Sequence, residues 1–454
     1  MDGLELSLEK MRREGLPEIA RQSFEHYYRR LAAGEQGMLP ESEIEPAVGV
    51  VDAESLPEGD DALLDQAVVI KLNGGLGTSM GMTGPKSLIE AREGQTFLDI
   101  TVQQVLRLRE RSGARVPLVL MNSFRTREQS LAALRRHPEL ELDVPLDFVQ
   151  GKVPKLRADD LTPVEWPADP ELEWAPPGHG DLYTSIVASG VLETLLEKGY
   201  RYAFVSNSDN LGAVLEPRIL RWFAERDLPF AMEVAERTES DKKGGHLARR
   251  RGGGLVLRET SQISADDQQA FEDVERHRYF NANTLWIDLD ALARTLRERD
   301  GVLGLPMIVN RKTVDPSDPD SPAVIQLESA MGAAIDVFEG ADAVRVPRRR
   351  FVPVKTTNDL LALRSDAYRI APDSAQVSLL PERADTPPVI DLDAANYKLL
   401  ADFERRFAAG PPSLIACERL TVNGDVSFGR GVVVRGAVTV DGPARIEDGA
   451  LLEG

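Results

Sequence analysis

Residues 71–87 read KLNGGLGTSMGMTGPKS, a glycine-rich turn that directly follows an apolar strand predicted over residues 68–72. Its five glycines let the backbone take positive φ and come very close to a ligand. Successive N–H groups in such a turn attract an anion, and Lys86 adds a full positive charge beside them. The segment therefore predicts a phosphorylated ligand, whereas the alternative is a loop that only reverses the chain.

Two commoner phosphate-binding motifs do not fit this turn. The P-loop needs a glycine directly before its lysine, but Pro85 separates Gly84 from Lys86. The dinucleotide fingerprint Gly-x-Gly-x-x-Gly needs its third glycine where Met80 stands. A kinase or a dehydrogenase is therefore disfavoured.

The composition limits the classes of partner. The chain has 454 residues, enough for two or three domains, and a formal charge of −20. This charge argues against nucleic acid or an anionic membrane as a partner, so an anionic nucleotide needs a local basic pocket. The single cysteine, Cys417, excludes an intrachain disulfide and fits a reducing compartment. Without a signal-peptide core or an apolar run of about 18 residues, the sequence predicts a soluble cytoplasmic protein.

From residue 62 the sequence alternates between apolar strands and amphipathic helices, which predicts an α/β fold with a mostly parallel sheet. Ligands of such sheets bind beyond the carboxyl ends of the strands, where the glycine turn, Asn122, Gln150 and residues 206–209 are expected. Strands are predicted at 68–72, 117–121, 146–149, 202–205, 230–234 and 284–287, and helices at 4–14, 19–33, 97–111 and 182–198.

The tail has a six-residue apolar repeat formed by Leu420, Val426, Val432 and Val438. This period is typical of a parallel β-helix, in which each face contributes one inward residue, and an antiparallel β-meander is the alternative. The predicted parts of the chain are a helical N-terminal segment with a linker (1–61), an α/β domain (62–350), a lysine-bearing connection (351–412) and a β-helix (413–454).

Longer blocks of the sequence resemble the eukaryotic-type UDP-glucose pyrophosphorylases, also called UTP–glucose-1-phosphate uridylyltransferases. These blocks are the glycine turn, TFLDITVQQ (96–104), PLVLMNSF (117–124), PPGHGDLY (176–183), FVSNSDNLG (204–212), KGG (243–245), NANTLW (281–286), VIQLESAMGAA (324–334) and RFVPVKTTNDLL (350–361). The resemblance implies a Rossmann-like, GT-A-like nucleotidyltransferase domain. It also implies that the tail is a left-handed β-helix, which in relatives supports a homo-oligomer.

The family makes UDP-glucose and pyrophosphate from UTP and glucose 1-phosphate by an in-line displacement at the α-phosphorus. The attacking phosphate oxygen is already ionised, so the enzyme needs no general base but must align two anions and neutralise their charge. A UDP-N-acetylhexosamine or broad UDP-sugar pyrophosphorylase is the alternative within the class. A catalytically silent assembly scaffold is the alternative outside it, and the presence of Lys86, Asp209 and Lys355 together argues against that.

Two lysines and one aspartate are the candidates for handling the phosphates. Lys86 and Lys355 are the predicted catalytic residues, and Lys355 lies between a predicted strand (350–354) and a helix-start signal at 356–359. Asp209 is the predicted ligand of Mg²⁺, a cation that takes only one or two carboxylates plus substrate oxygens. The alternatives are solvated charges for the two lysines and a helix or turn cap for Asp209.

The remaining candidates are assigned to one of the two substrates. Gln150 suits uracil because an amide offers both a donor and an acceptor, and the resemblance implies Gly178 and His179 near the nucleotide and the sugar. The predicted nucleotide-binding residues are Leu72, Asn73, Gly74, Gly75, Gly77, Thr78, Lys86, Gln150, Gly178 and Asp209. The predicted sugar-phosphate-binding residues are His179, Asn207, Ser208, Asn281, Asn283, Glu328 and Lys355.

Several of these residues keep a second interpretation. His179 can be a turn-stabilising side chain, and Asn281, Asn283 and Glu328 can be turn and cap residues. Lys243 either contacts phosphate or lies in a plain loop, and residues 249–254 are predicted to form a flexible hairpin.

Overall fold

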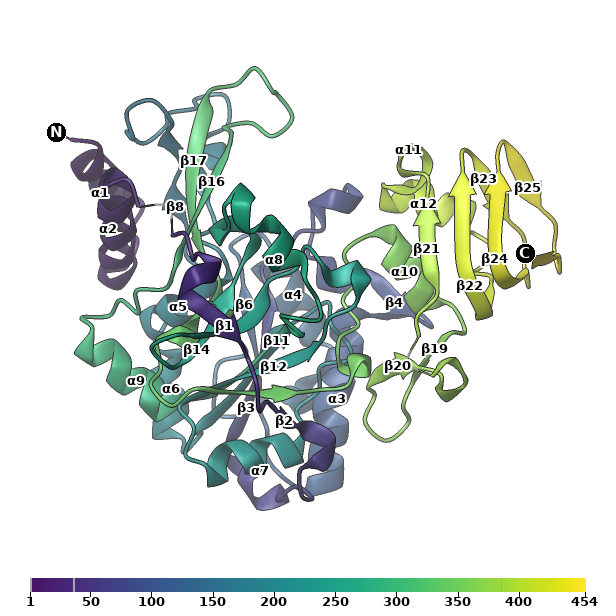
Figure 1. Ribbon diagram of the computed structural model, residues 1–454, viewed down its shortest axis with the longest axis horizontal. Coiled ribbons are helices and arrows are strands. Elements are labelled where there is room, and N and C mark those ends of the chain that lie inside the picture. Colours follow the sequence, from purple (N-terminus) through teal and green to yellow (C-terminus); the bar gives the residue numbers. More distant parts are fainter. Residues whose placement is uncertain (1, 36, 385) are drawn as a thin grey trace.

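An 11-stranded sheet lies at the centre of the protein (Figure 1), whose computed structural model describes residues 2–35, 37–384 and 386–454. The main path of the sheet is, in order, β2 (Val51–Asp52), β18 (Asp342–Arg345), β12 (Phe230–Glu236), β15 (Tyr279–Asp288), β11 (Tyr202–Asn207), β3 (Ala67–Asn73), β6 (Leu118–Asn122) and β7 (Asp147–Val149). β15 is antiparallel to both of its neighbours, and the other neighbouring pairs on this path are parallel. The six predicted strands and the mostly parallel α/β fold are confirmed.

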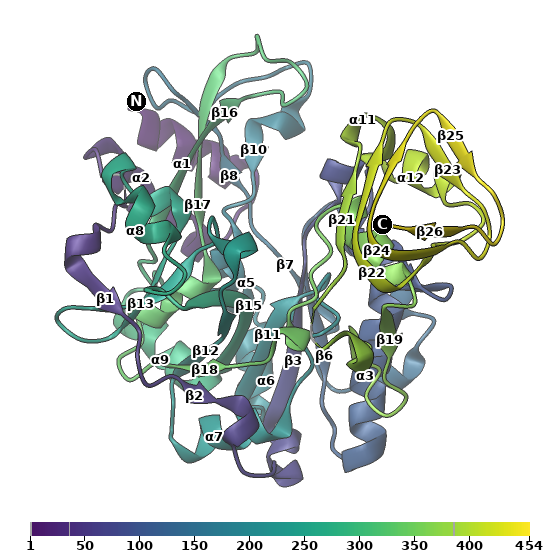
Figure 2. The ribbon, with the colours of Figure 1, turned by 45° about the vertical axis from the view of Figure 1, so that its right-hand side comes forward.

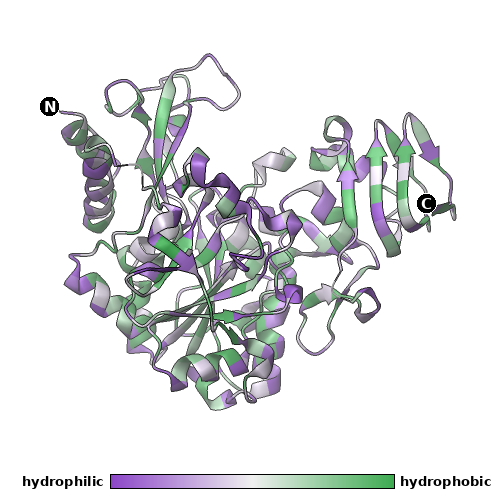
Figure 3. Cartoon of the chain, in the orientation of Figure 1, coloured by the Kyte–Doolittle hydropathy of each residue, from purple (hydrophilic) through white to green (hydrophobic). Residues whose placement is uncertain are grey.

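The side chains of β3 alternate between two separate cores, which explains the continuous apolar run in the sequence. Val68 and Ile70 belong to one core, together with side chains of α5 (Leu182–Ala188), α6 (Val191–Glu197) and α9 (Leu289–Glu298). Val69 belongs to the other core, with side chains of α3 (Phe97–Ser112) and α7 (Pro217–Glu225). Helices therefore cover both faces of the sheet (Figure 2), as is usual for parallel sheets, and apolar residues gather along its strands (Figure 3).

Two predicted helices of this domain have different outcomes. α3 is confirmed, because Thr96 and Asp99 form a capping box at its start and Gly113, with φ of +74°, ends it. The predicted single helix over 182–198 is wrong. It is divided into α5 and α6, because Gly190 takes φ of +76° and a right-handed helix cannot continue through that conformation.

The two predicted N-terminal helices are confirmed as α1 (Gly3–Arg13) and α2 (Glu18–Ala32), which form a separate layer at the edge of the molecule (Figure 1). They pack through Leu4, Met11, Phe24 and Tyr28 on a small sheet of β16 (Met307–Thr313), β17 (Ala323–Ser329) and β9 (Leu156–Arg157). The predicted hairpin at 249–254 joins β13 (His246–Arg250) to β14 (Leu255–Arg258), which are antiparallel. In the described ranges 2–35, 37–384 and 386–454, we find no helix with the length and apolar character of a membrane span.

The C-terminal strands lie beside the main sheet in a stack of their own (Figure 1). β21 (Val389–Leu392), β22 (Ser413–Asn423), β24 (Val433–Asp441) and β26 (Leu451–Glu453) are parallel, and so are β23 (Val426–Phe428) and β25 (Ala444–Ile446). The four residues of the six-residue repeat, Leu420, Val426, Val432 and Val438, are all buried. This parallel pairing excludes an antiparallel meander for these strands.

Candidate active site

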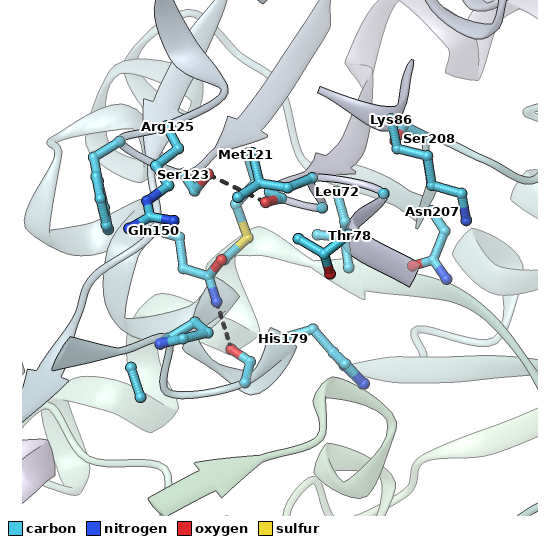
Figure 4. A pocket seen from close by; sticks show the side chains of 18 of the residues that line it. Leu72, Thr78, Lys86, Met121, Ser123, Arg125, Gln150, His179, Asn207 and Ser208 are labelled. Atoms are coloured by element: carbon cyan, nitrogen blue, oxygen red, sulfur yellow. Dashed lines mark hydrogen bonds between the residues drawn. The ribbon is translucent and has the colours of Figure 1, made fainter. Parts of the chain in front are cut away.

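A cavity of about 590 Å³ opens beyond the carboxyl ends of β3, β6, β7 and β11 (Figure 4), where the sheet topology predicts a ligand. It receives its lining from the glycine turn, from the loops after β6, β7 and β11, and from residues 171–179. The predicted site residues that line it are Leu72, Gly74, Gly75, Gly77, Thr78, Lys86, Gln150, Gly178, His179, Asn207, Ser208 and Asp209.

The glycine turn is held in a fixed shape at one side of this cavity. Gly77 and Gly81 have φ of +61° and +74°, and the Lys86 N–H donates to the Gly75 carbonyl at 3.0 Å. The Ser123 hydroxyl, from the loop after β6, donates to the Gly74 carbonyl at 3.1 Å. The backbone is therefore closed on itself and tied to the neighbouring strand, while its glycines leave the N–H groups open to a ligand.

Lys86 and Asp209 form an ion pair at the end of the cavity, with the lysine Nζ 2.6 Å from Asp209 Oδ2. Both side chains are largely buried, at 15% and 18% exposure. The second oxygen, Asp209 Oδ1, is buried and has no hydrogen-bond partner. A buried carboxylate oxygen without a partner is costly, so this atom fits a cation bound together with the substrate.

Asp209 would hold such a cation outside any cluster of three or more protein ligands. Throughout residues 2–35, 37–384 and 386–454, we find no group of three or more His, Cys, Asp and Glu side chains placed to bind a metal. Mg²⁺ commonly binds one or two carboxylates and fills its other positions with water and substrate oxygens. The donor set therefore fits Mg²⁺ and does not fit a metal that needs a full protein cage.

Gln150 and Gly178 are hydrogen-bonded to each other in another part of the cavity lining. Gln150 Nε2 donates to the Gly178 carbonyl at 2.9 Å, and the Gln150 N–H donates to the Asn122 carbonyl at 2.6 Å. Gly178 has φ of +80°, and a Cβ at this position would lie 2.4 Å from the Ser329 carbonyl oxygen. Only glycine fits at position 178, which fixes the place of its carbonyl group. The hydrogen bond to this carbonyl in turn fixes the orientation of the Gln150 amide.

The side chain of Asp181 holds the Gly178 turn in place. Its carboxylate accepts from the Gly151 N–H at 2.6 Å and from the hydroxyl of Ser185. Burial raises the pKa of Asp181 to about 6. The side chain thus joins the loop that carries Gln150 to the turn that carries Gly178.

His179 lies in the cavity wall as a neutral imidazole. Its Nδ1 accepts from the Met331 N–H at 3.0 Å, which leaves the proton on Nε2. Desolvation by the surrounding protein lowers the pKa of His179 to about 4, in agreement with the hydrogen bond that its Nδ1 accepts from Met331. The ring can therefore donate one hydrogen bond to a ligand without carrying a positive charge.

Asn73 does not face the cavity. Because side chains of a strand alternate, Leu72 lines the cavity and the side chain of Asn73 points to the opposite face. There its Nδ2 donates to Asn122 Oδ1 at 2.7 Å and to Ser130 Oγ at 2.8 Å. The buried network explains the place of this side chain in the motif, and the predicted contact of Asn73 with the nucleotide stays a prediction.

Four other predicted residues lie outside the cavity lining. Asn281 and Asn283 of β15 are hydrogen-bonded to each other, with Asn281 Nδ2 3.0 Å from Asn283 Oδ1. Glu328 of β17 lies beside Gly178, where a Cβ on that glycine would come within 3.1 Å of the Glu328 Cβ. Their predicted contacts with the sugar stay predictions.

Lys355 is the fourth of the predicted residues that lie outside the cavity lining. It is exposed, and the helix-start signal that follows it at 356–359 is confirmed. Thr356 and Asp359 form a capping box at the start of α10 (Thr357–Arg364), and the Lys355 N–H donates to Asp359 Oδ2 at 2.8 Å. The predicted strand before it is wrong. Residues 348–350 form a 3₁₀ turn, and only Pro353 makes a single bridge, because proline has no N–H to continue a ladder.

Sequence reasoning missed much of the opposite wall. Phe124 and Arg125 follow β6, and Glu171 and Trp174 precede the Gly178 turn; all four line the cavity, and Arg125 forms an ion pair with Glu171 at 2.6 Å. The position of Asn122 at a strand end pointed toward the first pair. No local pattern marked the second pair, which lies in a 3₁₀ turn and the two-residue strand β10 (Trp174–Ala175).

The mostly parallel sheet, with a glycine turn and Lys86 lining the cavity at its carboxyl edge, is the arrangement expected of an α/β nucleotidyltransferase. The family model described as UTP–glucose-1-phosphate uridylyltransferase matches residues 21–435, and this chain belongs to that family. A relative of that name from Solanum tuberosum is 42% identical over 402 residues, which covers 87% of this chain and 82% of the relative. A probable UTP–glucose-1-phosphate uridylyltransferase from Schizosaccharomyces pombe is 40% identical over 379 residues, 83% of this chain and 73% of the relative.

Solved structures agree with these sequence relatives. A crystal structure of a mutant UDP-glucose pyrophosphorylase from Leishmania major in complex with UDP-glucose is similar to this chain with a TM-score of 0.93 at 44% identity. The match covers 100% of this chain and 98% of that chain. A UDP-glucose phosphorylase from Trypanosoma brucei has a TM-score of 0.91 at 46% identity, over 99% of this chain and 98% of that one.

Proposed function

We propose that this chain makes UDP-glucose and pyrophosphate from UTP and glucose 1-phosphate, and that it also catalyses the reverse reaction. The observation that carries the proposal is the meeting of the glycine turn, Lys86 and Asp209 in one cavity with Gln150. Groups that attract phosphate lie at one side of this cavity and an oriented amide at the other (Figure 4), which suits a nucleoside triphosphate. The similar Leishmania major structure holds UDP-glucose, which supports the same product here.

In this proposal Gln150 recognises the base of the nucleotide. One hydrogen of its Nε2 is used by the Gly178 carbonyl, so the amide oxygen and the other hydrogen remain for a ligand. Uracil presents an N–H beside a carbonyl oxygen and pairs with both. Cytosine presents an unprotonated ring nitrogen at the same place, so UTP is favoured over CTP.

The cations neutralise the phosphates. The glycine turn receives the triphosphate on its backbone N–H groups, and Lys86 leaves Asp209 to contact the α-phosphoryl group. Asp209 is the residue that would hold Mg²⁺, which when bound supplies positive charge at the α-phosphoryl oxygens. In this proposal Lys355 and the neutral N–H of His179 orient the phosphate of the sugar, whose ionised oxygen attacks without a general base.

The polar residues predicted to bind the sugar phosphate recognise the hydroxyl groups of the sugar. Asn207, Ser208, Asn281, Asn283 and Glu328 offer the donors and acceptors that sugar hydroxyls require. Three of these side chains come from β15 and β17, which border the loops that carry Asp209 and His179. Their contacts then distinguish glucose 1-phosphate from other sugar phosphates.

The finer features of the fold complete the proposal. The main domain is of the Rossmann-like GT-A type, and the parallel stack from β21 to β26 is a left-handed β-helix that joins copies of the chain. The free Cys417, buried in that stack, fits a reducing cytoplasm. Size-exclusion chromatography with light scattering of the full chain, compared with a chain that ends at residue 412, measures the contribution of the stack to assembly.

The reaction is tested by pyrophosphate release with UTP, Mg²⁺ and a panel of sugar 1-phosphates. We expect kcat/KM to be highest for glucose 1-phosphate and much lower for galactose 1-phosphate and N-acetylglucosamine 1-phosphate. CTP in place of UTP serves as the control for the base. A preference for N-acetylglucosamine 1-phosphate, or no release with any sugar, would overturn the proposal.

A further inference from the structure

Asn210 directly follows Asp209, and its buried side chain joins two segments that the proposed mechanism uses separately. Its exposure is only 2%. Its Oδ1 accepts from the Val352 N–H at 2.9 Å and from the Gly212 N–H at 3.3 Å, and its Nδ2 donates to the Arg350 carbonyl at 3.1 Å. One side chain therefore connects the loop that carries Asp209 to the segment that leads to Lys355.

The backbones of the two segments also touch at this point. Asn210 forms an isolated antiparallel bridge with Pro353, and the Val354 N–H donates to the Asp209 carbonyl at 3.3 Å. Lys355 is the next residue along the chain, and its own N–H is held by Asp359. The backbone of Lys355 is thus fixed between the Asn210 contacts on one side and the helix cap on the other.

Contacts on both sides restrict the position of the segment that leads to Lys355. Arg350 is anchored by two bonds to the buried Glu233, with Nε 2.8 Å from Oε2 and Nη2 2.7 Å from Oε1. Gly212 lies so close to the chain that a Cβ there would be 2.6 Å from the Arg349 carbonyl oxygen. Phe351 packs edge-on against Phe280 and Val354 is buried in a core. The side chain of Asn210 supplies the polar contacts that fix the backbone of this segment past Asp209.

We infer that Asn210 is a positioning residue that sets the place of Lys355 relative to the Asp209 and Lys86 pair. The inference rests on the role proposed above for Lys355. A misplacement of about 1 Å can cost about a hundredfold in rate when two anions must be aligned. Loss of the Asn210 side chain should therefore lower kcat by about ten- to a hundredfold, with little change in the KM for UTP, since Asn210 does not line the cavity.

A double-mutant cycle tests this inference. Turnover is measured for the full chain, for Asn210→Ala, for Lys355→Ala and for the double variant, with UTP and glucose 1-phosphate at saturation. If Asn210 acts through Lys355, Asn210→Ala should cost less than about threefold in the Lys355→Ala background. Asn396→Ala removes another asparagine with two side-chain bonds, to Asp393 and Arg406, away from the cavity and should leave turnover unchanged.

The outcomes separate the two proposals. Unchanged turnover in Lys355→Ala alone overturns the role of Lys355, whereas losses that multiply in the double variant overturn the role of Asn210. Hydrogen exchange gives a second readout, because Asn210→Ala should speed exchange of the Val352 and Val354 amides while peptides of β3 and β11 stay protected. If the alanine variant does not fold, Asn210→Ser is used in the same cycle, and unchanged amide exchange in the serine variant would equally refute the inference.

Discussion

Lys86→Met removes an ammonium group from the cavity while keeping most of the volume of the side chain. In the protein without substrate this ammonium lies 2.6 Å from Asp209 Oδ2, which corresponds to an attraction of about 1.6 kcal/mol at a dielectric constant of about 80 and about 6 kcal/mol at about 20. The variant leaves Asp209 unneutralised beside the incoming triphosphate, so the lost attraction and the new repulsion act in the same direction. Loss of one such stabiliser of the transition state costs about 2.7–4 kcal/mol, and we expect kcat to fall by about 10² to 10³.

The assay is steady-state pyrophosphate release with both substrates varied, so that kcat and the KM for UTP are obtained separately. Lys198→Met, which removes an exposed lysine that does not line the cavity, is the matched control and should behave like the unchanged protein. Thermal unfolding of both variants shows whether the fold is kept. Turnover of Lys86→Met within about threefold of the unchanged protein would refute the reasoning, since a lysine that contacts the α-phosphoryl group cannot be removed at so small a cost.

Lys355→Ala should keep the fold and lower kcat by at least about a hundredfold in the same assay, and unchanged turnover would contradict its role. Gly178→Ala should destabilise the protein and raise the KM for UTP, because its Cβ would meet the Ser329 carbonyl at 2.4 Å; a normal KM and normal thermal stability would oppose this. Burial raises the pKa of Asp181 to about 6, above its value near 3.9 in an unfolded chain, so the native state holds this proton more tightly. The contribution to the free energy of unfolding is therefore fully present below about pH 4 and decreases by on the order of 3 kcal/mol as the pH rises to about 6 and above. Urea titrations at pH 4, 5 and 7 should show a smaller decrease in Asp181→Asn, and an identical pH dependence in both proteins would count against it. Chelation of divalent cations should abolish turnover and added Mg²⁺ should restore it, whereas full activity in excess chelator would exclude the role of Asp209 as a metal ligand.

The central sheet and one half of the cavity were predictable because local sequence decides them. Continuous apolar runs marked the strands buried on both faces, and the position of Gln150 and Asp209 after such runs placed both at one edge of the sheet. Glycines and a lysine in one short turn marked the phosphate side. These features need no knowledge of distant contacts.

The remaining features depend on contacts that sequence patterns do not show. The pairing of Lys86 with Asp209 joins residues 123 positions apart, and the wall formed by Arg125 and Trp174 comes from irregular segments. The buried hydrogen bonds of the Asn73 side chain with Asn122 and Ser130 also join residues that are far apart in the sequence. The break at Gly190 and the missing strand before Lys355 follow from single glycine and proline residues, whose local effect outweighed the apolar pattern.

A crystal structure of the protein with UTP and Mg²⁺ tests the central claim most directly. The triphosphate should lie on the N–H groups of residues 74–78, with Lys86 turned from Asp209 toward the α-phosphoryl group and uracil beside Gln150. A triphosphate bound at another place, with the glycine turn empty and Lys86 still paired with Asp209, would contradict the account.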